Sequence, residues 1–197
     1  MKTKTIDMIR LPCPKPMLEA KKALSDEATK GIIVKVDNLP CVQNLEKMSE
    51  SFGYDFSFFK ISKDIFEVTI NKKIQPHATR HHPSTYYPPT GISIGSDTMG
   101  SGEKELGKVL IKGFIYSLTE LDISPKFIAF FNSGVYLTNE KANTVKDLKK
   151  LEEKGTEILS CGTCLNYYNL TTPAVGTVAN MYEITEKLTS INCVVNI

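Results

Sequence analysis

The sequence predicts an α/β protein of two domains, a two-layer α/β sandwich followed by a three-layer Rossmann-like domain. Three observations lead to this prediction: strand and helix patterns alternate along the chain, a proline-rich segment interrupts them, and a strand after the interruption is apolar on both faces. The interruption, residues 73–90, contains four prolines, which remove backbone donors and disfavour helix. We therefore expect domains at residues 1–72 and 91–197, joined by a linker.

The first domain is expected to have the element order βαβαββ. Apolar residues at helical spacing begin after Pro14, and Gly31 is expected to end this first helix. Gly53 is expected to end the second helix. Two helices on one face of a four-stranded sheet suffice for a small two-layer domain. The expected elements are strand 4–8, helix 14–29, strand 32–36, helix 42–52 and a hairpin of strands 54–61 and 65–70.

The second domain is expected to alternate strands and helices around a parallel sheet. Residues 126–131 are almost wholly apolar, which is typical of a strand covered on both faces. A long amphipathic helix is expected from apolar positions that include Leu106, Val109 and Leu110. The expected elements are strand 91–95, a helix through 106–121, strand 126–131, helix 144–154, strand 157–159, helix 180–188 and strand 192–196.

The composition excludes several classes of protein. The apolar content of 41% is ordinary, and the longest apolar run, Phe127–Phe131, is too short to span a bilayer. The basic N-terminus has no apolar segment after it, so we expect no signal peptide. The net charge of +2 comes from 24 basic and 22 acidic side chains without a basic cluster, which argues against nucleic-acid binding. We expect a cytoplasmic protein with no membrane or nucleic-acid partner.

The cysteines indicate reduced thiols. Five cysteines, an odd number, occur in a chain without secretory features, so a structural disulfide framework is not expected. Cys41 falls at a strand-to-helix turn, where we expect a buried or capping residue. The cysteines are Cys13, Cys41, Cys161, Cys164 and Cys193.

Cys13 stands in the segment Leu11–Pro16, at a predicted strand-to-helix junction. Pro14 fits the first helical position, which places Cys13 at the N-cap. There the unpaired helix amides, the helix dipole and the neighbouring Lys15 favour the thiolate, the reactive form. Pro14 and Pro16 also stiffen the loop around the sulfur. The alternative is a cap residue on a proline-rich turn without a chemical role.

This first segment resembles the TusA/SirA-like sulfur carriers over residues 5–71. The resemblance rests on Asp7, Leu11 and the motif Cys13-Pro14-x-Pro16 before a helix. It implies that Cys13 accepts and donates a persulfide sulfur. The family usually has Arg-Gly before the leucine, whereas this chain has Ile9-Arg10.

A second candidate site is Cys161-Gly162-Thr163-Cys164, which follows a predicted strand and starts a helical turn. The spacing has three interpretations: a redox dithiol, half of a zinc site, or a carrier thiol with a neighbour. A zinc site needs about four ligands. No second such pair exists, and His77, His81 and His82 lie far away in the linker. We expect no metal, and core packing of the two cysteines stays an alternative.

The second domain resembles the DsrE-like fold of sulfur-relay subunits, through a cysteine after a strand followed by Leu165 and Leu170. The resemblance implies that Cys161 is the carrier thiol and that the domain assembles into homo-oligomers. Cys164 is then an extra thiol able to resolve a persulfide by forming a disulfide. Both halves together resemble the YedF group, sulfurtransferase-like selenium-metabolism proteins, through the segments 132–135 and 161–164.

A glycine-rich segment, Gly95–Gly102, follows a strand and precedes a helix, as phosphate-binding loops do. It has Ser101-Gly102 where a nucleotide-binding loop needs Lys-Ser/Thr, and Glu105 where a dinucleotide fingerprint has its third glycine. We expect a structural turn here and no bound cofactor.

The expected function is that of a sulfur or selenium carrier or transferase. It would relay a cysteine persulfide or selenosulfide, held by Cys13, between donor and acceptor proteins. The sequence leaves open whether the chain is an enzyme. Two alternatives stay open: a thiol–disulfide redox protein that uses the Cys161 and Cys164 pair, and a regulatory module that only docks a partner.

Overall fold

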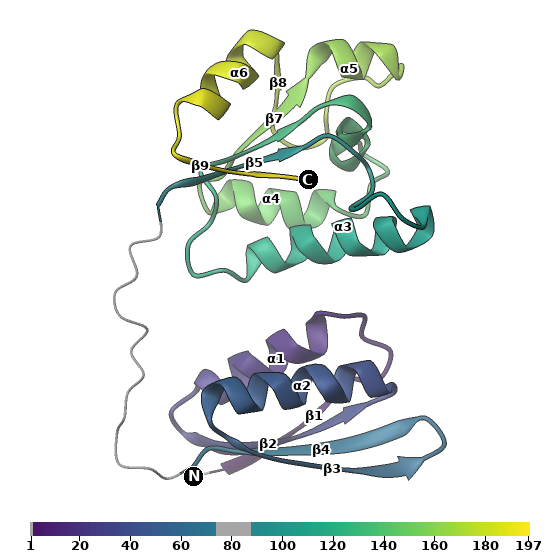
Figure 1. The fold of residues 1–197 in the computed structure, drawn as a ribbon, viewed down its shortest axis with the longest axis vertical. Helices are drawn as coiled ribbons and strands as arrows, with labels where there is room; N and C mark the ends of the chain where they lie inside the picture. The colour runs from purple at the N-terminus through teal and green to yellow at the C-terminus, as the bar shows by residue number, and fades with distance from the viewer. Residues whose placement is uncertain (1, 74–87) are drawn as a thin grey trace. The chain divides into compact units, whose positions relative to one another are not determined.

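The computed structural model describes residues 2–73 and 88–197. The chain divides into two compact units, residues 1–81 and 82–197, each with its own sheet and hydrophobic core (Figure 1). Most of the predicted linker, with its three histidines, lies outside the described residues. No helix in the described part of the chain is long and apolar enough to cross a membrane.

The first unit is a four-stranded sheet with two helices on one face (Figure 1). Its elements are β1 Lys2–Asp7, α1 Lys15–Ser25, β2 Thr29–Val36, α2 Leu39–Phe52, β3 Asp55–Ser62 and β4 Ile65–Asn71. The strand order is β1-β2-β4-β3, with β1 and β2 parallel and the other pairs antiparallel. The predicted two-layer βαβαββ sandwich is confirmed.

Both helices bury one apolar face against this sheet. In α1 the buried face carries Ala20 and Leu24, and in α2 it carries Val42 and Leu45. Helix α2 ends as predicted at Gly53, whose φ of 68° is the left-handed conformation that glycine adopts without steric cost. Because β1 and β2 are parallel, both helices begin at the same edge of the sheet.

The first helix ends earlier than the predicted residue 29. The Asp26 carboxylate accepts a hydrogen bond from the backbone N–H of Ala28 at 3.0 Å, in a turn that leads directly into β2. The prediction that Gly31 ends this helix was therefore wrong. Gly31 pairs within the sheet, where an added Cβ would lie 2.8 Å from the backbone carbonyl oxygen of Ile70, so the close approach of the strands favours glycine.

The second unit is a five-stranded parallel sheet between layers of helices (Figure 1). Its elements are β5 Thr90–Ile94, α3 Lys104–Thr119, β6 Phe127–Phe130, the 3-10 helix η1 Asn132–Thr138, α4 Val145–Glu153, β7 Glu157–Cys161, α5 Gly162–Tyr167, β8 Thr177–Ala179, α6 Met181–Thr189 and β9 Cys193–Asn196. The strand order is β8-β7-β6-β5-β9. Helices α3 and α4 cover one face and α6 the other, which confirms the predicted three-layer Rossmann-like architecture.

Helix α3 buries only part of the apolar set expected along residues 106–121, in which Leu118 is 6% exposed. Leu106, Val109 and Leu110 are 57%, 58% and 45% exposed. Ile111 and Ile115 pack into the core instead, at 1% and 0% exposed. The helix is apolar on two faces, so hydrophobic spacing alone does not tell which face meets the sheet.

Two short elements, η1 and β8, were absent from the prediction. In η1, Gly134 approaches β5 closely, because a Cβ there would lie 2.2 Å from the carbonyl oxygen of Ile94. Strand β8 has only three residues, too few to show a period, and pairs with the end of β7. The helical turn predicted after Cys161 is present as α5.

Candidate functional site

Cys13 lies on the loop between β1 and α1, and its side chain is exposed. The backbone N–H of Lys15 donates a hydrogen bond to the carbonyl of Pro12 at 3.0 Å, which closes a turn before the helix. Pro14 is therefore the N-cap residue, and Pro16 lies in the first helical turn. The predicted placement of Cys13 at the N-cap was wrong by one residue, because the turn takes up both Cys13 and Pro14.

Two carboxylates hold the loop that leads to Cys13. The Asp7 carboxylate accepts a hydrogen bond from the backbone N–H of Ile9 at 3.0 Å. The carboxylate of Asp37, which follows β2, accepts one from the backbone N–H of Arg10 at 2.7 Å. Arg10 has a φ of 65°, a left-handed conformation that costs a non-glycine residue about 1–2 kcal/mol. The loop thus keeps a shape suited to glycine although the chain has arginine there.

Asn44 supplies a hydrogen-bond donor to the exposed thiol. Its side-chain amide, on α2, donates to Cys13 Sγ across 3.7 Å. The parallel pairing of β1 with β2 brings the start of α2 beside the Cys13 loop. An amide donor at this position stabilises negative charge on the sulfur and orients it.

Cys41 is a buried neighbour of this site, 5% exposed in the first turn of α2. Its backbone N–H donates to the side chain of Asn38 at 2.9 Å, which caps the helix. Burial is the main cause that raises the pKa of Cys41, and a hydrogen bond between the Cys41 thiol and the Asn38 side chain opposes this. The charge of Cys13 raises the same pKa further. Cys41 is a buried, protonated thiol, as the prediction of a buried or capping residue requires.

Cys161 and Cys164 lie together where β7 passes into α5. Cys161 ends the strand and is the N-cap of α5, with a side chain only 1% exposed. Cys164 is partly exposed. Cys164 is the third residue of the same helix, one turn beyond Cys161, and the two thiols are close enough for Cys161 to raise the pKa of Cys164. The structure brings the two predicted cysteines into contact and gives the outer position to Cys164.

A second strand end supplies a donor to Cys164. The backbone N–H of Asn132, the first residue of η1 and two residues beyond the end of β6, donates to Cys164 Sγ at 3.1 Å. The Asn132 side chain in turn accepts a hydrogen bond from the hydroxyl of Tyr168 at 2.8 Å. Partial burial raises the pKa of Tyr168, and the phenols of Tyr136 and Tyr167 raise it further, so this hydroxyl stays a donor.

The environment of Cys164 favours the protonated thiol. Burial is the main cause that raises its pKa, and the contact with Cys161 raises it further. The Asn132 amide acts in the opposite direction, because it stabilises the thiolate. Cys164 is therefore mostly a thiol at neutral pH and a strong nucleophile once it ionises.

Loops after three neighbouring parallel strands meet at this edge of the sheet, where α/β proteins commonly bind ligands. From the loop after β5, the backbone N–H of Asp97 donates to Ser133 Oγ at 3.3 Å, and its carboxylate lies near Tyr168. The loop holds its own shape, since Thr98 donates from its backbone N–H to Ser96 Oγ at 3.1 Å. This geometry agrees with the predicted structural turn.

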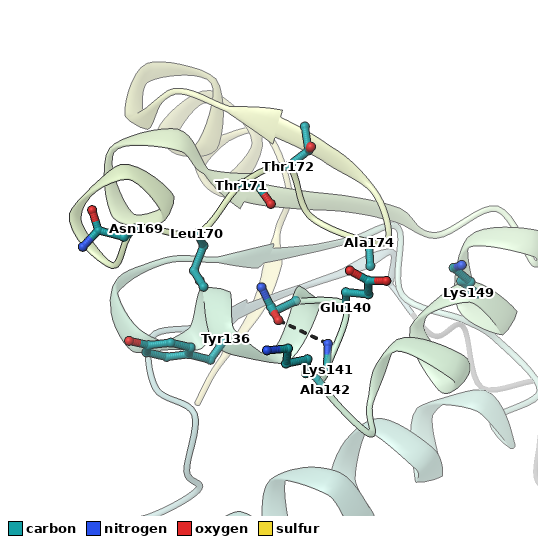
Figure 2. A pocket seen from close by; sticks show the side chains of 11 residues that line it. Tyr136, Glu140, Lys141, Ala142, Lys149, Asn169, Leu170, Thr171, Thr172 and Ala174 are labelled. Carbon is teal, nitrogen blue, oxygen red and sulfur yellow. Dashed lines mark hydrogen bonds between the residues drawn. The ribbon is translucent and has the colours of Figure 1, made fainter.

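An open hollow of about 890 Å³ borders the same region. Figure 2 shows Tyr136 and Lys149 on opposite sides of it, with Glu140 and Lys141 between. The Tyr136 ring, which lines the hollow, packs against Tyr168 with ring centroids 4.9 Å apart. Its lining mixes both charges with threonine and asparagine, and the hollow is wide rather than enclosed.

Two further points concern possible metal ligands and the position of Cys193. Within residues 2–73 and 88–197, no group of three His, Cys, Asp or Glu side chains is placed to hold a metal ion. Cys193 begins β9 and pairs with Thr90 at the amino ends of the parallel strands. It therefore lies at the opposite edge of the sheet from Cys161.

Sequence reasoning missed three residues of these sites. Asn44 is separated from Cys13 by 31 residues, and no local pattern links them. No sequence pattern gives Tyr168 a place in the site, although its hydroxyl holds Asn132. Asn132 carried a usable signal, because a polar residue directly after a buried strand falls at the ligand-binding edge of a parallel sheet.

Comparison with known proteins identifies the first unit. The family profile of the sulfurtransferase TusA matches residues 4–72. A crystal structure of a SirA-like protein from Desulfitobacterium hafniense is 39% identical, with 35% of this chain and 96% of that protein covered and a TM-score of 0.33. A comparison with curated proteins found no match.

Two other solved structures are similar at low identity. A protein of unknown function from Methanobacterium thermoautotrophicum is 12% identical, with 55% of this chain and 97% of that protein covered and a TM-score of 0.41. The ychN protein from E. coli is 15% identical, with 56% of this chain and all of that protein covered (100%) and a TM-score of 0.40. The fold of the second unit rests on its own strand order.

Proposed function

This chain belongs, through residues 4–72, to the TusA/SirA family of sulfurtransferases, and from this premise we propose that it carries sulfane sulfur or selenium on Cys13. The observation that carries the proposal is the exposed Cys13 thiol on a loop held by Asp7 and Asp37 and contacted by the Asn44 amide. A fixed, accessible thiol with a polar donor is what transfer between proteins needs.

The chemical step is a thiol exchange without net redox change. The Cys13 thiolate attacks the outer sulfur of a donor persulfide, R–S–SH, and forms a new sulfur–sulfur bond. The bond between the donor's two sulfurs breaks, and the electron pair leaves on the donor thiolate. The product, Cys13–S–SH, is attacked in the same way by an acceptor thiolate. Selenium is carried by the same exchange, as Cys13–S–SeH.

The partners we propose are donor and acceptor proteins that hold sulfur as a cysteine persulfide or selenium as a selenosulfide. A free thiol carrier needs a reducing compartment, and for that reason we assign it to the cytoplasm. The second unit's resemblance to DsrE-like relay subunits supports a role in the same transfer and assembly of that unit into homo-oligomers.

The test is to load the reduced protein with glutathione persulfide, block thiols with iodoacetamide and analyse the peptides by mass spectrometry. We expect the added sulfur on the Cys13 peptide, and we expect an added thiol acceptor to remove it. Parallel loading with the selenium analogue, glutathione selenopersulfide, compares the two elements in one assay.

Cys193→Ser is the matched control, because Cys193 lies at the opposite edge of the other unit's sheet from its thiol pair. This variant should load at Cys13 as the wild type does, whereas Cys13→Ser should lose the adduct from that peptide. A Cys13 peptide that stays unmodified while other thiols of the chain are loaded would remove the basis of the proposal.

A further inference from the structure

The two thiols of the second unit differ in access. Cys161 is 1% exposed at the end of β7, whereas Cys164 is partly exposed one turn of α5 further on. A sulfur donor of protein or small-molecule size meets Cys164 first. The buried thiol reacts only with what Cys164 has already accepted.

The geometry keeps the two sulfurs together in a fixed order. Cys161 is the N-cap residue of α5 and Cys164 is its third residue, so a single helical turn separates two neighbouring thiols, and the influence of Cys161 raises the pKa of Cys164. The hydrogen bond from the Asn132 amide to Cys164 Sγ fixes the outer sulfur from the neighbouring strand end. Tyr168 holds Asn132 through the hydroxyl bond of 2.8 Å.

We propose that Cys161 and Cys164 form a catalytic dithiol that takes up sulfane sulfur on Cys164 and releases it as sulfide. In the first step the Cys164 thiolate attacks the outer sulfur of a persulfide R–S–SH, and RS⁻ leaves. In the second step the Cys161 thiolate attacks the Cys164 sulfur, the bond to the outer sulfur breaks, and HS⁻ leaves with the electron pair.

Atoms and electrons balance in this sequence. The sulfane sulfur gains two electrons and becomes sulfide, and the two cysteine thiols lose them and become the Cys161–Cys164 disulfide. The proton of the Cys161 thiol is released as that thiol ionises. A small dithiol reductant restores the pair through ordinary thiol–disulfide exchange, so each later turnover consumes one reductant.

The surroundings of Cys164 select release over onward transfer to Cys161. Attack on the outer sulfur would expel the Cys164 thiolate, and a thiolate of raised pKa leaves slowly. Attack on the Cys164 sulfur itself expels hydrosulfide, the weaker base. The roles of the two thiols are therefore the reverse of those implied by the family resemblance, which gave Cys161 the carried sulfur.

The proposed sulfide release rests on the proposed carrier function in one respect, because both take up sulfur as a persulfide. It is tested on the full-length protein by feeding glutathione persulfide directly, without another reductant, and by measuring sulfide together with the thiol state of each peptide. We expect at most one sulfide per chain and a matching loss of two hydrogens from the peptide that contains both cysteines. A dithiol reductant should make the release catalytic.

Two variants separate the steps. Cys161→Ala should stop sulfide release and leave a stable persulfide on Cys164, while Cys164→Ala should show neither release nor an adduct on Cys161. Cys193→Ser should release sulfide as the wild type does. Circular dichroism of each variant checks that it is folded, and Cys161→Ser serves if the alanine variant is not.

The outcomes are distinct. Release that survives in a folded Cys161 variant, or an adduct on Cys161 in the absence of Cys164, would overturn the proposal. Absence of an adduct on Cys13 in the same peptide maps would contradict the carrier function alone, because glutathione persulfide delivers sulfur to Cys164 without Cys13.

Discussion

The backbone N–H of Asn132 donates a hydrogen bond to Cys164 Sγ at 3.1 Å. This contact joins the end of β6 to the first turn of α5, and it places a polar donor on the more exposed of two neighbouring thiols. Asn132 has a φ of 49°, in the left-handed region that asparagine tolerates better than most residues. The position of the donor therefore depends on a local backbone conformation as well as on the sheet.

Tyr168→Phe tests how that donor is held. The substitution removes the hydroxyl bond to Asn132 and keeps the ring that packs against Tyr136. We expect the free energy of unfolding to fall by at most about 0.5–1 kcal/mol, since the bond is exposed to solvent. Iodoacetamide should modify Cys164 faster, because the segment around Asn132 is less constrained. If the alkylation rate of Cys164, measured relative to that of Cys13, is unchanged, then Tyr168 does not constrain the segment around Cys164.

The pH dependence of Cys164 follows from its environment. Its pKa is raised, chiefly by burial and then by Cys161, so the reactive thiolate appears only at higher pH than in a free thiol. The midpoint of the alkylation rate against pH should lie above the free-thiol value of about 8.5. In Cys161→Ala one raising influence is removed, and the midpoint should move to lower pH. A midpoint in the wild type at or below the free-thiol value would contradict the structural account.

Asn44→Ala removes the amide that reaches Cys13 Sγ. We expect Cys13 to load from glutathione persulfide about two- to fivefold more slowly, the effect of a weak hydrogen bond of roughly 0.5–1 kcal/mol. Asn44→Asp should slow loading further, because a carboxylate repels a thiolate. Gln43→Ala, at an exposed neighbouring position of α2, is the matched control. Equal loading rates in all four proteins would show that the 3.7 Å contact is incidental.

Arg10→Gly tests the conformation of the loop before Cys13. Glycine adopts the observed φ of 65° without steric cost, which removes about 1–2 kcal/mol of strain. The more flexible unfolded chain offsets about 0.5–1 kcal/mol of that gain. Chemical denaturation should show the variant to be more stable by up to about 1 kcal/mol. A clear loss of stability would mean that the arginine side chain contributes more than its backbone costs.

The sequence predicted both architectures because each unit has a clear alternation of elements. It could not tell which apolar face of α3 is buried, since Leu106 and Ile111 belong to different faces of the same helix and both are apolar. It also extended α1 too far, because no helical spacing reveals that Asp26 turns the chain. Decisions of this kind depend on tertiary packing, which a local pattern does not contain.

For the candidate sites, the sequence singled out Cys13, Cys161 and Cys164 as candidates but did not reveal their surroundings. The donors to Cys13 and Cys164 come from other βα units, Asn44 and Asn132, which only the strand order brings near. The relative burial of Cys161 and Cys164 was equally hidden, because the local sequence does not show which of two cysteines three residues apart faces the core. The structure alone gives the outer position to Cys164.

The last prediction is that sulfur loaded on Cys13 moves to Cys164. The two thiol sites of the chain would act in one transfer if Cys13, the exposed carrier, gave its sulfur to Cys164, the more exposed thiol of the pair. Tethered sites meet at an effective concentration on the order of millimolar, so even a weak encounter is frequent. The experiment adds labelled sulfane sulfur to Cys13 in Cys161→Ala, where release is blocked, and follows the label by peptide mass spectrometry.

We expect the label to leave Cys13 and accumulate on Cys164, and to stay on Cys13 when Cys164 is also replaced by alanine. Cys193→Ser in the Cys161→Ala background should change nothing. Mixing a Cys13-loaded Cys164→Ala protein with an unloaded Cys13→Ser, Cys161→Ala protein tells transfer between chains from transfer within one. The first variant can only give sulfur and the second can only receive it on Cys164. Label that remains on Cys13 under conditions where an external thiol removes it would mean that the two thiol sites serve different partners.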